Sequence, residues 1–238
     1  MNDVLAIFRR EFRSYFDSPV AYIFITVFLV LAGWLFYSGF FIMNFASLRS
    51  YFDLLPWMFL FFVPAVTMRL WSEEKKLGTM ELLMTLPVRD IDVVIGKFLA
   101  SFSFMTLTIL LTFPLIITVF ALGNPDSGPI IGGYLGAILM GGAYLSIGMF
   151  ASSLNENQII AFILGVVICF GLFMVGEGFV LMRVPGSWAA FFQYLGLGSH
   201  FRSIGRGVID SRDIVYYFSV IFFFLFMNLR ALESRKGH

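Results

Sequence analysis

Six long apolar runs constrain what this chain can fold into. They cover residues 20–43, 54–70, 98–122, 130–154, 159–182 and 214–229. A helix needs about 20 apolar residues to cross the hydrocarbon core of a bilayer. Because the runs are continuous rather than alternating, they predict helices and not barrel strands. We therefore expect an all-α integral membrane protein, with one transmembrane domain over residues 1–238 and six spanning helices.

The composition argues against the alternative of a soluble domain with a very apolar core. Hydrophobic residues make up 59% of the 238 residues and charged residues only 13%, whereas about a quarter of a soluble domain is charged. A soluble fold of this length could not bury so much apolar surface. The net charge of +1 gives no support for nucleic-acid binding. The one cysteine, Cys169, lies inside an apolar run, where we expect a small buried hydrophobe.

The distribution of Lys and Arg predicts the orientation of the chain in the membrane. One side holds the N-terminus, residues 69–97, the turn at 152–158 and the C-terminus, and it carries eleven basic residues. The other side carries five, four of them in one long connection. Basic connections stay in the cytoplasm, so both termini are predicted to be cytoplasmic.

Residues 1–18 predict an amphipathic helix that lies along the inner face of the membrane. One side of this helix is apolar and the other is rich in arginine, and the candidate residues are Phe8, Phe12, Arg9, Arg10 and Arg13. Ile7 and Glu11 fit this division less well. Pro19 then turns the chain into the first spanning helix. We expect an interfacial helix because no soluble domain is predicted on which it could pack.

A charged segment, residues 72–90, interrupts the apolar runs on the predicted cytoplasmic side. Ser72 is a candidate N-cap for a helix whose first turn holds Glu73 and Glu74. Gly78 is expected to end that helix, and Thr79 to cap a second, shorter one.

The second short helix is expected to have an apolar face and a defined end. Leu82, Leu83 and Leu86 contribute to the apolar face, Glu81 lies in the first turn, and Pro87 stops the helix. Asp90 is then expected to cap the helix that leads into the third span. Lipid or the groove of a partner protein must cover such an apolar face.

Residues 183–213 form the longest connection on the predicted outer side. They are too apolar for a free loop and too interrupted by Gly and Pro for a spanning helix, so we expect a re-entrant element in the outer leaflet. Glu177 is the one acid inside an apolar run, six residues before Arg183. An acid within a span is a functional candidate, and a place for Glu177 on a substrate path stays open. We favour a structural role for Glu177 at the start of this element, paired with an outer arginine.

Small residues in the fourth run predict close helix packing. Gly132 and Gly136 form one row, and Gly133, Ala137 and Gly141 form a parallel one. We expect these rows to serve packing within the chain rather than a dimer contact.

The stretch "EEKKLGTMELLMTLPVRDIDVVIGKF" closely resembles the cytoplasmic segment of ABC-2 type transporter permeases. The residues that match the family pattern are Glu74, Gly78, Thr79, Glu81, Leu82, Leu83, Pro87, Gly96 and Lys97. The tail "YLGLGSHFRSIGRGVIDSRDIVYYFSV" resembles the subgroup that includes the gliding-motility permease GldF and the copper-site maturation permease NosY. The resemblance covers nearly the whole chain.

The resemblance implies a coupling helix within residues 72–90, which would insert into a cleft of a separate ABC ATPase subunit. The interfacial helix would lie beside it. Leu82, Leu83 and Leu86 would fill an apolar pocket, while Glu81 would set the orientation.

The resemblance also implies the assembly. Two ATPase subunits would dock on a permease dimer, formed by two copies of this chain or by this chain and a similar one. ATP and Mg would be bound by the ATPase, so this chain would hold no cofactor and no catalytic residue. The complex would export a cell-envelope substrate across a bacterial inner membrane, and an outer accessory protein is a further candidate partner.

The residues also fit a chain without an ATPase or metal site of its own. A phosphate-binding loop needs G-x-x-x-x-G-K-[ST], and the nearest match, residues 123–128, lacks the Lys and the Ser or Thr. His200 and His238 have no His or Cys near them in sequence, so no metal site is predicted.

Two alternatives to an exporter stay open. The first is a secondary carrier or channel that uses Glu177. The second is a membrane scaffold that anchors a complex without transport.

Overall fold

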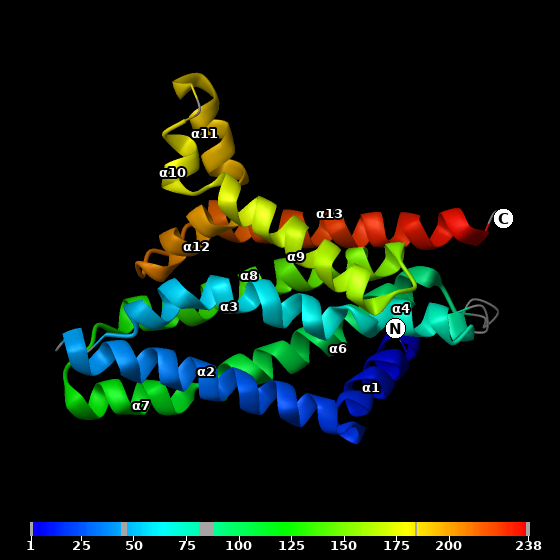
Figure 1. The fold of residues 1–238 in the computed structure, drawn as a ribbon, viewed down its shortest axis with the longest axis horizontal. Helices are drawn as coiled ribbons and strands as arrows, with labels where there is room; N and C mark the ends of the chain where they lie inside the picture. Colours follow the sequence, from blue (N-terminus) through cyan, green and yellow to red (C-terminus); the bar gives the residue numbers. More distant parts are fainter. Residues whose placement is uncertain (1, 44–46, 81–87, 184, 237–238) are drawn as a thin grey trace.

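The computed structural model shows a bundle of helices that run side by side (Figure 1). It describes all residues except 1, 44–46, 81–87, 184 and 237–238. The helices are α1 (Asn2–Asp17), α2 (Pro19–Met43), α3 (Arg49–Thr67), α4 (Arg69–Lys76), α6 (Asp90–Leu110), α7 (Phe113–Leu122), α8 (Ser127–Leu154), α9 (Gln158–Val175), α10 (Gly178–Leu181), α11 (Gly186–Leu195), α12 (Leu197–Gly205) and α13 (Ser211–Lys236).

Six helical segments are long and apolar enough to cross a membrane. They are Pro19–Phe40, Arg49–Lys76, Asp90–Leu122, Ser127–Leu154, Gln158–Val175 and Ser211–Ser234. The second combines α3 with α4, and the third combines α6 with α7. The expected all-α architecture with six candidate spanning helices is thus confirmed.

The ends of these segments differ from the ends of the apolar runs. The second and third segments extend into the charged sequence around residues 72–90, because the helices continue past the apolar residues. The fifth is shorter than the run at 159–182, since α9 ends at Val175. At the next residue, Gly176, an added Cβ would lie 2.7 Å from the Cα of Gly196. This close crossing of two backbone segments accompanies the end of α9.

Helix α8 forms the centre of the bundle. Its spanning segment is 83% buried, against 17% for that of α13, and it packs against α3, α6, α9, α12 and α13. The glycine rows make these contacts close. A Cβ on Gly132 would lie 2.3 Å from the Ile204 carbonyl oxygen of α12, and one on Gly133 would lie 2.3 Å from the Phe52 ring of α3. The small residues therefore serve packing within this chain.

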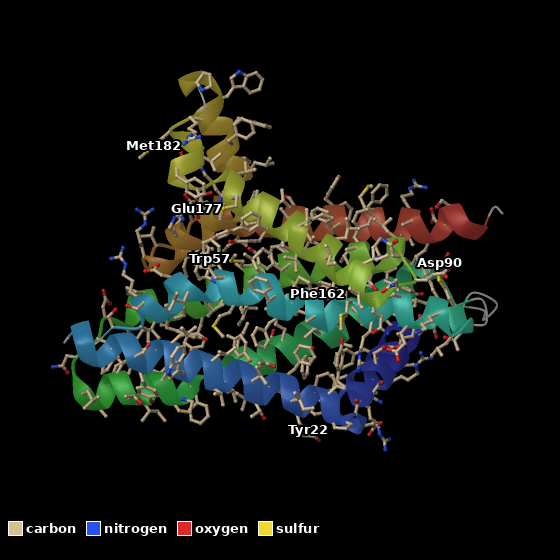
Figure 2. All side chains as sticks on the ribbon, in the orientation of Figure 1. Tyr22, Trp57, Asp90, Phe162, Glu177 and Met182 are labelled. Atoms are coloured by element: carbon tan, nitrogen blue, oxygen red, sulfur yellow. The ribbon has the colours of Figure 1, made fainter. Side chains whose placement is uncertain are left out.

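The bundle has two different ends (Figure 1). Helix α1 lies across one end, which also holds α4, the beginning of α6 and the end of α13; we call it the α1 end. The other holds α12 and the beginnings of α3 and α8; we call it the α12 end. Helices α10 and α11 project from the side of the bundle near the α12 end, with Glu177 at the base of this projection and Asp90 at the opposite end of the molecule (Figure 2).

Gly132→Ala should destabilise the fold, because the added methyl group meets a backbone carbonyl that cannot rotate away. Overpacking of this kind costs about 1–3 kcal/mol. Gly171→Ala is the matched control, since a Cβ there meets nothing within 4 Å. Thermal unfolding of the purified protein in detergent should show a lower Tm for Gly132→Ala and no loss for Gly171→Ala. Equal Tm values for the two variants would contradict this packing.

Candidate functional site at the α1 end

Helix α1 packs directly across the beginning of α6 because Gly96 leaves room for it. A Cβ on Gly96 would lie 2.7 Å from Cγ2 of Ile7. Glu11, one helical turn further along α1, reaches Lys97, the next residue of α6. Ile7 and Glu11 are the two residues that fit the amphipathic pattern poorly. The structure shows why: both face α6 rather than follow the division between lipid and water.

Lys97 connects three helices through its buried ammonium group. Its Nζ lies 2.7 Å from Oε1 of Glu74 in α4 and 3.2 Å from Oε1 of Glu11 in α1. It also donates to the carbonyl oxygen of Leu70 at 3.3 Å. An ammonium group has three N–H donors, so these acceptors match its full capacity. We call Lys97, Glu11, Glu74 and the Leu70 carbonyl the Lys97 node.

The charges of the node are balanced by a fourth side chain. The Lys97 side chain is 2% exposed, and a buried charge is tolerated only when it is paired and hydrogen-bonded. Arg10 places Nη2 at 3.1 Å from Oε1 of Glu11 and 3.7 Å from Oε1 of Glu74. Two carboxylates thus face two cations. The Lys97 ammonium also lies 5.2 Å from the centroid of the Trp71 ring, within the range of a cation–π contact.

Helix α4 is attached to the central helix through Ser152 of α8. The Ser152 hydroxyl accepts hydrogen bonds from the backbone N–H groups of Trp71 and Ser72 at 3.1 and 3.2 Å, and donates to the Met68 carbonyl at 2.8 Å. These groups lie around the interruption between α3 and α4, so Ser152 satisfies backbone atoms that the junction leaves open.

The prediction that Ser72 begins a helix is wrong. Ser72 lies inside α4, which starts at Arg69, and its hydroxyl donates to the carbonyl of Met68. The prediction failed because α4 continues the line of α3, and the first turn of α4 is capped by Ser152 from another helix. Asp90 is likewise in the first turn of α6, whose N-cap residue is Arg89.

The predicted break at Gly78 is confirmed. Helix α4 ends at Lys76, and Gly78 has a φ of 69°, in the left-handed region that favours glycine. The Thr79 hydroxyl donates to the carbonyl oxygen of Glu74 at 3.3 Å. The coupling candidates that follow lie outside the described residues: Glu81, Leu82, Leu83, Leu86 and Pro87.

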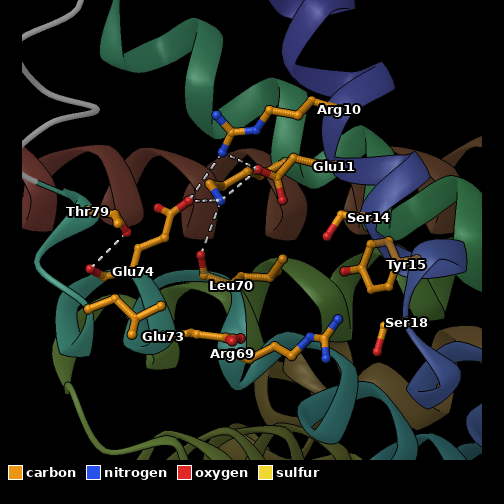
Figure 3. Close-up of a pocket in the computed structure, with 12 residues that line it drawn as sticks. Arg10, Glu11, Ser14, Tyr15, Ser18, Arg69, Leu70, Glu73, Glu74 and Thr79 are labelled. Atoms are coloured by element: carbon orange, nitrogen blue, oxygen red, sulfur yellow. Dashed lines mark hydrogen bonds and ion pairs between the residues drawn. The ribbon is translucent and has the colours of Figure 1, made fainter.

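A cavity of about 560 Å³ lies between α1 and α4, next to the Lys97 node (Figure 3). Its walls come from α1, α4, the residues after α4 and Lys97, and it is lined by Arg10, Glu11, Ser14, Tyr15, Ser18, Arg69, Leu70, Glu73, Glu74, Leu77, Thr79 and Lys97. The predicted interfacial helix and the beginning of the predicted coupling segment thus share one polar pocket.

Tyr15 attaches the second half of α1 to α6. Its hydroxyl forms a 3.0 Å hydrogen bond with Ser101, and its ring stacks on Phe104 at a centroid distance of 4.8 Å. Burial raises the pKa of Tyr15 to about 12, against the opposing effect of the Ser101 hydrogen bond. The hydroxyl therefore stays neutral at physiological pH.

The remaining candidates of α1 divide between two environments. Phe8 and Phe12 are half-buried and stack on each other at 5.6 Å. Arg9 and Arg13 are exposed, and Arg13 lies 3.7 Å from Asp17. Of the three arginines, only Arg10 takes part in the charge cluster around Lys97.

Glu177 lies far from this site, near the α12 end (Figure 2). Its Oε1 lies 2.5 Å from Nη1 of Arg202, and Arg202 also donates to the Gly176 carbonyl at 3.3 Å. Arg183 is exposed. Within the described ranges, no group of three or more His, Cys, Asp or Glu side chains could hold a metal ion.

Glu74→Gln should destabilise the α1 end, whereas Glu73→Gln should not. Glu74 pairs with a buried ammonium, and a hydrogen bond to a charged group contributes about 1.5–3 kcal/mol. The neighbouring Glu73 is exposed and forms no ion pair with Lys97. Thermal unfolding in detergent should give a lower Tm for Glu74→Gln alone. An equal loss for both variants would mean that the Lys97 contact is not what stabilises this end.

Comparison with known proteins places this chain in a family. No curated protein matches the chain. A family model described as "ABC-2 family transporter protein" matches residues 43–201, which is more than half of the chain and includes Glu74 and Lys97. This family supplies the membrane domain of ABC transporters, and the ATPase site belongs to a partner. The chain belongs to the ABC-2 transporter family and is a multi-pass membrane component of an ABC transporter.

Proposed function

We propose that this chain is the permease subunit of an ATP-driven exporter, and that the Lys97 node carries the movement of the ATPase into the spanning helices. The observation that carries the proposal is the triple contact of Lys97. One buried ammonium joins α1, α4 and α6, and α4 and α6 flank the segment that resembles a coupling helix.

The continuity of the helices gives this contact a mechanical role. Helix α4 continues α3, and α6 continues into α7, so each belongs to a candidate spanning segment. A push on residues 77–89 would act on the end of α4 and the beginning of α6 together. Because the Lys97 node ties both helices to α1, we expect the three to move as one unit. Coupling between distant sites is carried by packed, hydrogen-bonded elements of this kind.

The distribution of charge supports a cytoplasmic α1 end. The eleven basic residues of the predicted cytoplasmic side lie in α1, in and around α4, at the beginning of α6 and at the end of α13. Under this orientation both termini are cytoplasmic, α1 is the interfacial helix, and α10 and α11 form the re-entrant outer element. We place the protein in a bacterial inner membrane.

The proposed complex contains two ABC ATPase subunits and two permease chains. The ATPase subunits bind ATP and Mg, and dock on residues 72–90 of each permease chain. The tail resemblance supports a GldF-like or NosY-like subgroup and a cell-envelope cargo, with gliding motility as one candidate process. An outer accessory protein would contact the α12 end.

Glu81→Lys and Leu83→Asp should each abolish binding of the ATPase subunit. The first reverses a charge at the proposed interface, and the second places a carboxylate in an apolar pocket, where an unpaired charge is costly. Co-purification of the tagged chain in mild detergent, with and without an ATP analogue, measures the effect. The unchanged chain should bring an ATPase at one copy per permease.

The control for this experiment is Glu156→Lys. Glu156 is an exposed acid in the turn between α8 and α9, at the same end of the bundle. It should leave ATPase binding intact. A dimeric, folded chain that brings no ATPase under any condition would refute the proposal.

Glu177→Gln separates the exporter from a carrier or channel that depends on this acid. In the exporter, Glu177 serves as the partner of Arg202, so the variant should keep ATP-driven activity while Leu83→Asp loses it. Nucleotide-dependent transport or ATP hydrolysis by the assembled complex is the measurement. Loss of activity in Glu177→Gln with full activity in Leu83→Asp would favour the carrier.

A further inference from the structure

A second large cavity, of about 820 Å³, lies at the α12 end. It is bounded by the beginning of α3, the loop before α8, the beginning of α8 and one side of α12. Part of its lining is apolar and buried, and this part consists of Leu48, Phe52, Ile130 and Phe201. The size falls within the range of about 300–1,000 Å³ that is usual for ligand pockets.

Three arginines line this cavity. Arg202 lies on α12, Arg206 is the C-cap residue of that helix, and Arg49 lies at the beginning of α3. Arg202 is already paired with Glu177. Among the residues that the structure describes, no carboxylate forms an ion pair with Arg49 or Arg206.

Two acids also line the cavity, and they limit its positive charge. Asp126 accepts a hydrogen bond from the backbone N–H of Gly128 at 3.0 Å, at the beginning of α8. Asp53 is exposed at the beginning of α3. The lining of three arginines and two aspartates has a formal net charge of +1, which favours a ligand with a single anionic group over a polyanion.

Helix α12 is held in place on two sides, so the backbone that carries Arg202 and the adjoining Arg206 is fixed. On one side, Gly132 and Gly136 of α8 allow the Ile204 carbonyl and the Phe201 ring to approach closely. On the other, His200 lies 2.6 Å from Oδ1 of Asp213 and 2.8 Å from the Tyr194 carbonyl. In a preorganised site, less binding free energy is lost to the ordering of side chains.

We propose that this cavity binds the headgroup of an amphiphile that carries one phosphate or carboxylate. Arg49 and Arg206 would hold the anion, since guanidinium groups form two parallel hydrogen bonds with such groups. The apolar lining around Phe52 and Phe201 would take the adjoining hydrocarbon. The inference rests on the proposed function in one respect: the amphiphile is taken to be the cargo of the exporter.

Direct binding to the purified full-length chain tests this proposal. Microscale thermophoresis in neutral detergent would compare dihexanoyl phosphatidic acid, dihexanoyl phosphatidylcholine and inorganic phosphate. We expect the anionic lipid to bind most tightly. Arg49→Gln combined with Arg206→Gln should weaken its binding by about 10–100-fold, the loss expected for hydrogen bonds to a charged group.

Two further variants control for charge and folding. Arg183→Gln removes an exposed arginine that does not line the cavity, and it should leave the Kd unchanged. Arg206→Lys keeps the positive charge but loses the planar guanidinium group. It should give a Kd between that of the unchanged chain and that of the double variant. Equal binding of all variants, equal binding of the two lipids, or equal binding of inorganic phosphate alone would each overturn the amphiphile site.

The outcome is separable from that of the proposed function. The titration contains neither ATPase nor nucleotide, so a failure here leaves the coupling proposal standing. Conversely, tight and arginine-dependent lipid binding by a chain that recruits no ATPase would support the site and refute the exporter.

Discussion

The ammonium group of Lys97 lies where a charge cannot be left without partners. It is buried at the point where α1 crosses α6, and its neutralisation requires Glu11 from one helix and Glu74 from another. Gly96 makes the crossing possible, because any larger residue would collide with Ile7. This contact helps to fix the position of α1 and the attachment of α4, together with Tyr15 and Ser152, and it forms part of the lining of the adjacent cavity. We propose that movement of a partner ATPase enters the membrane domain at this contact.

The central helix, α8, links the α1 end of the bundle to the α12 end. At the α1 end, Ser152 of α8 satisfies the backbone at the junction of α3 and α4. Toward the α12 end, Gly132 of the same helix receives the backbone of α12. A single buried helix thus contacts both the proposed coupling site and the proposed headgroup cavity. Rigid packing along α8 is a physical route by which the two ends could influence each other.

The sequence predicts features that depend on local chemistry. Long apolar runs predict the six spanning segments, and the break at Gly78 follows from a left-handed backbone that few other residues adopt. Features made by distant residues could not be predicted in this way. The cap of α4 comes from Ser152, some eighty residues away, so Ser72 was given the wrong role. The poor fit of Glu11 to its helix and the match of Glu74 and Lys97 to the family pattern were sequence signals at this site, but only the structure brought the three residues together.

A double-mutant cycle on the two carboxylates tests the role of Lys97 most directly. ATP hydrolysis by the assembled permease–ATPase complex in lipid would be measured for Glu11→Gln, Glu74→Gln and the combined variant. Each single change leaves Lys97 with one carboxylate, whereas the double change leaves a buried ammonium with none, a situation that costs far more than a weakened pair. We predict that the double variant loses more activity than the product of the two single effects. Strictly multiplicative losses would show that the two carboxylates act independently, and that Lys97 does not join α1 and α4 into one moving unit.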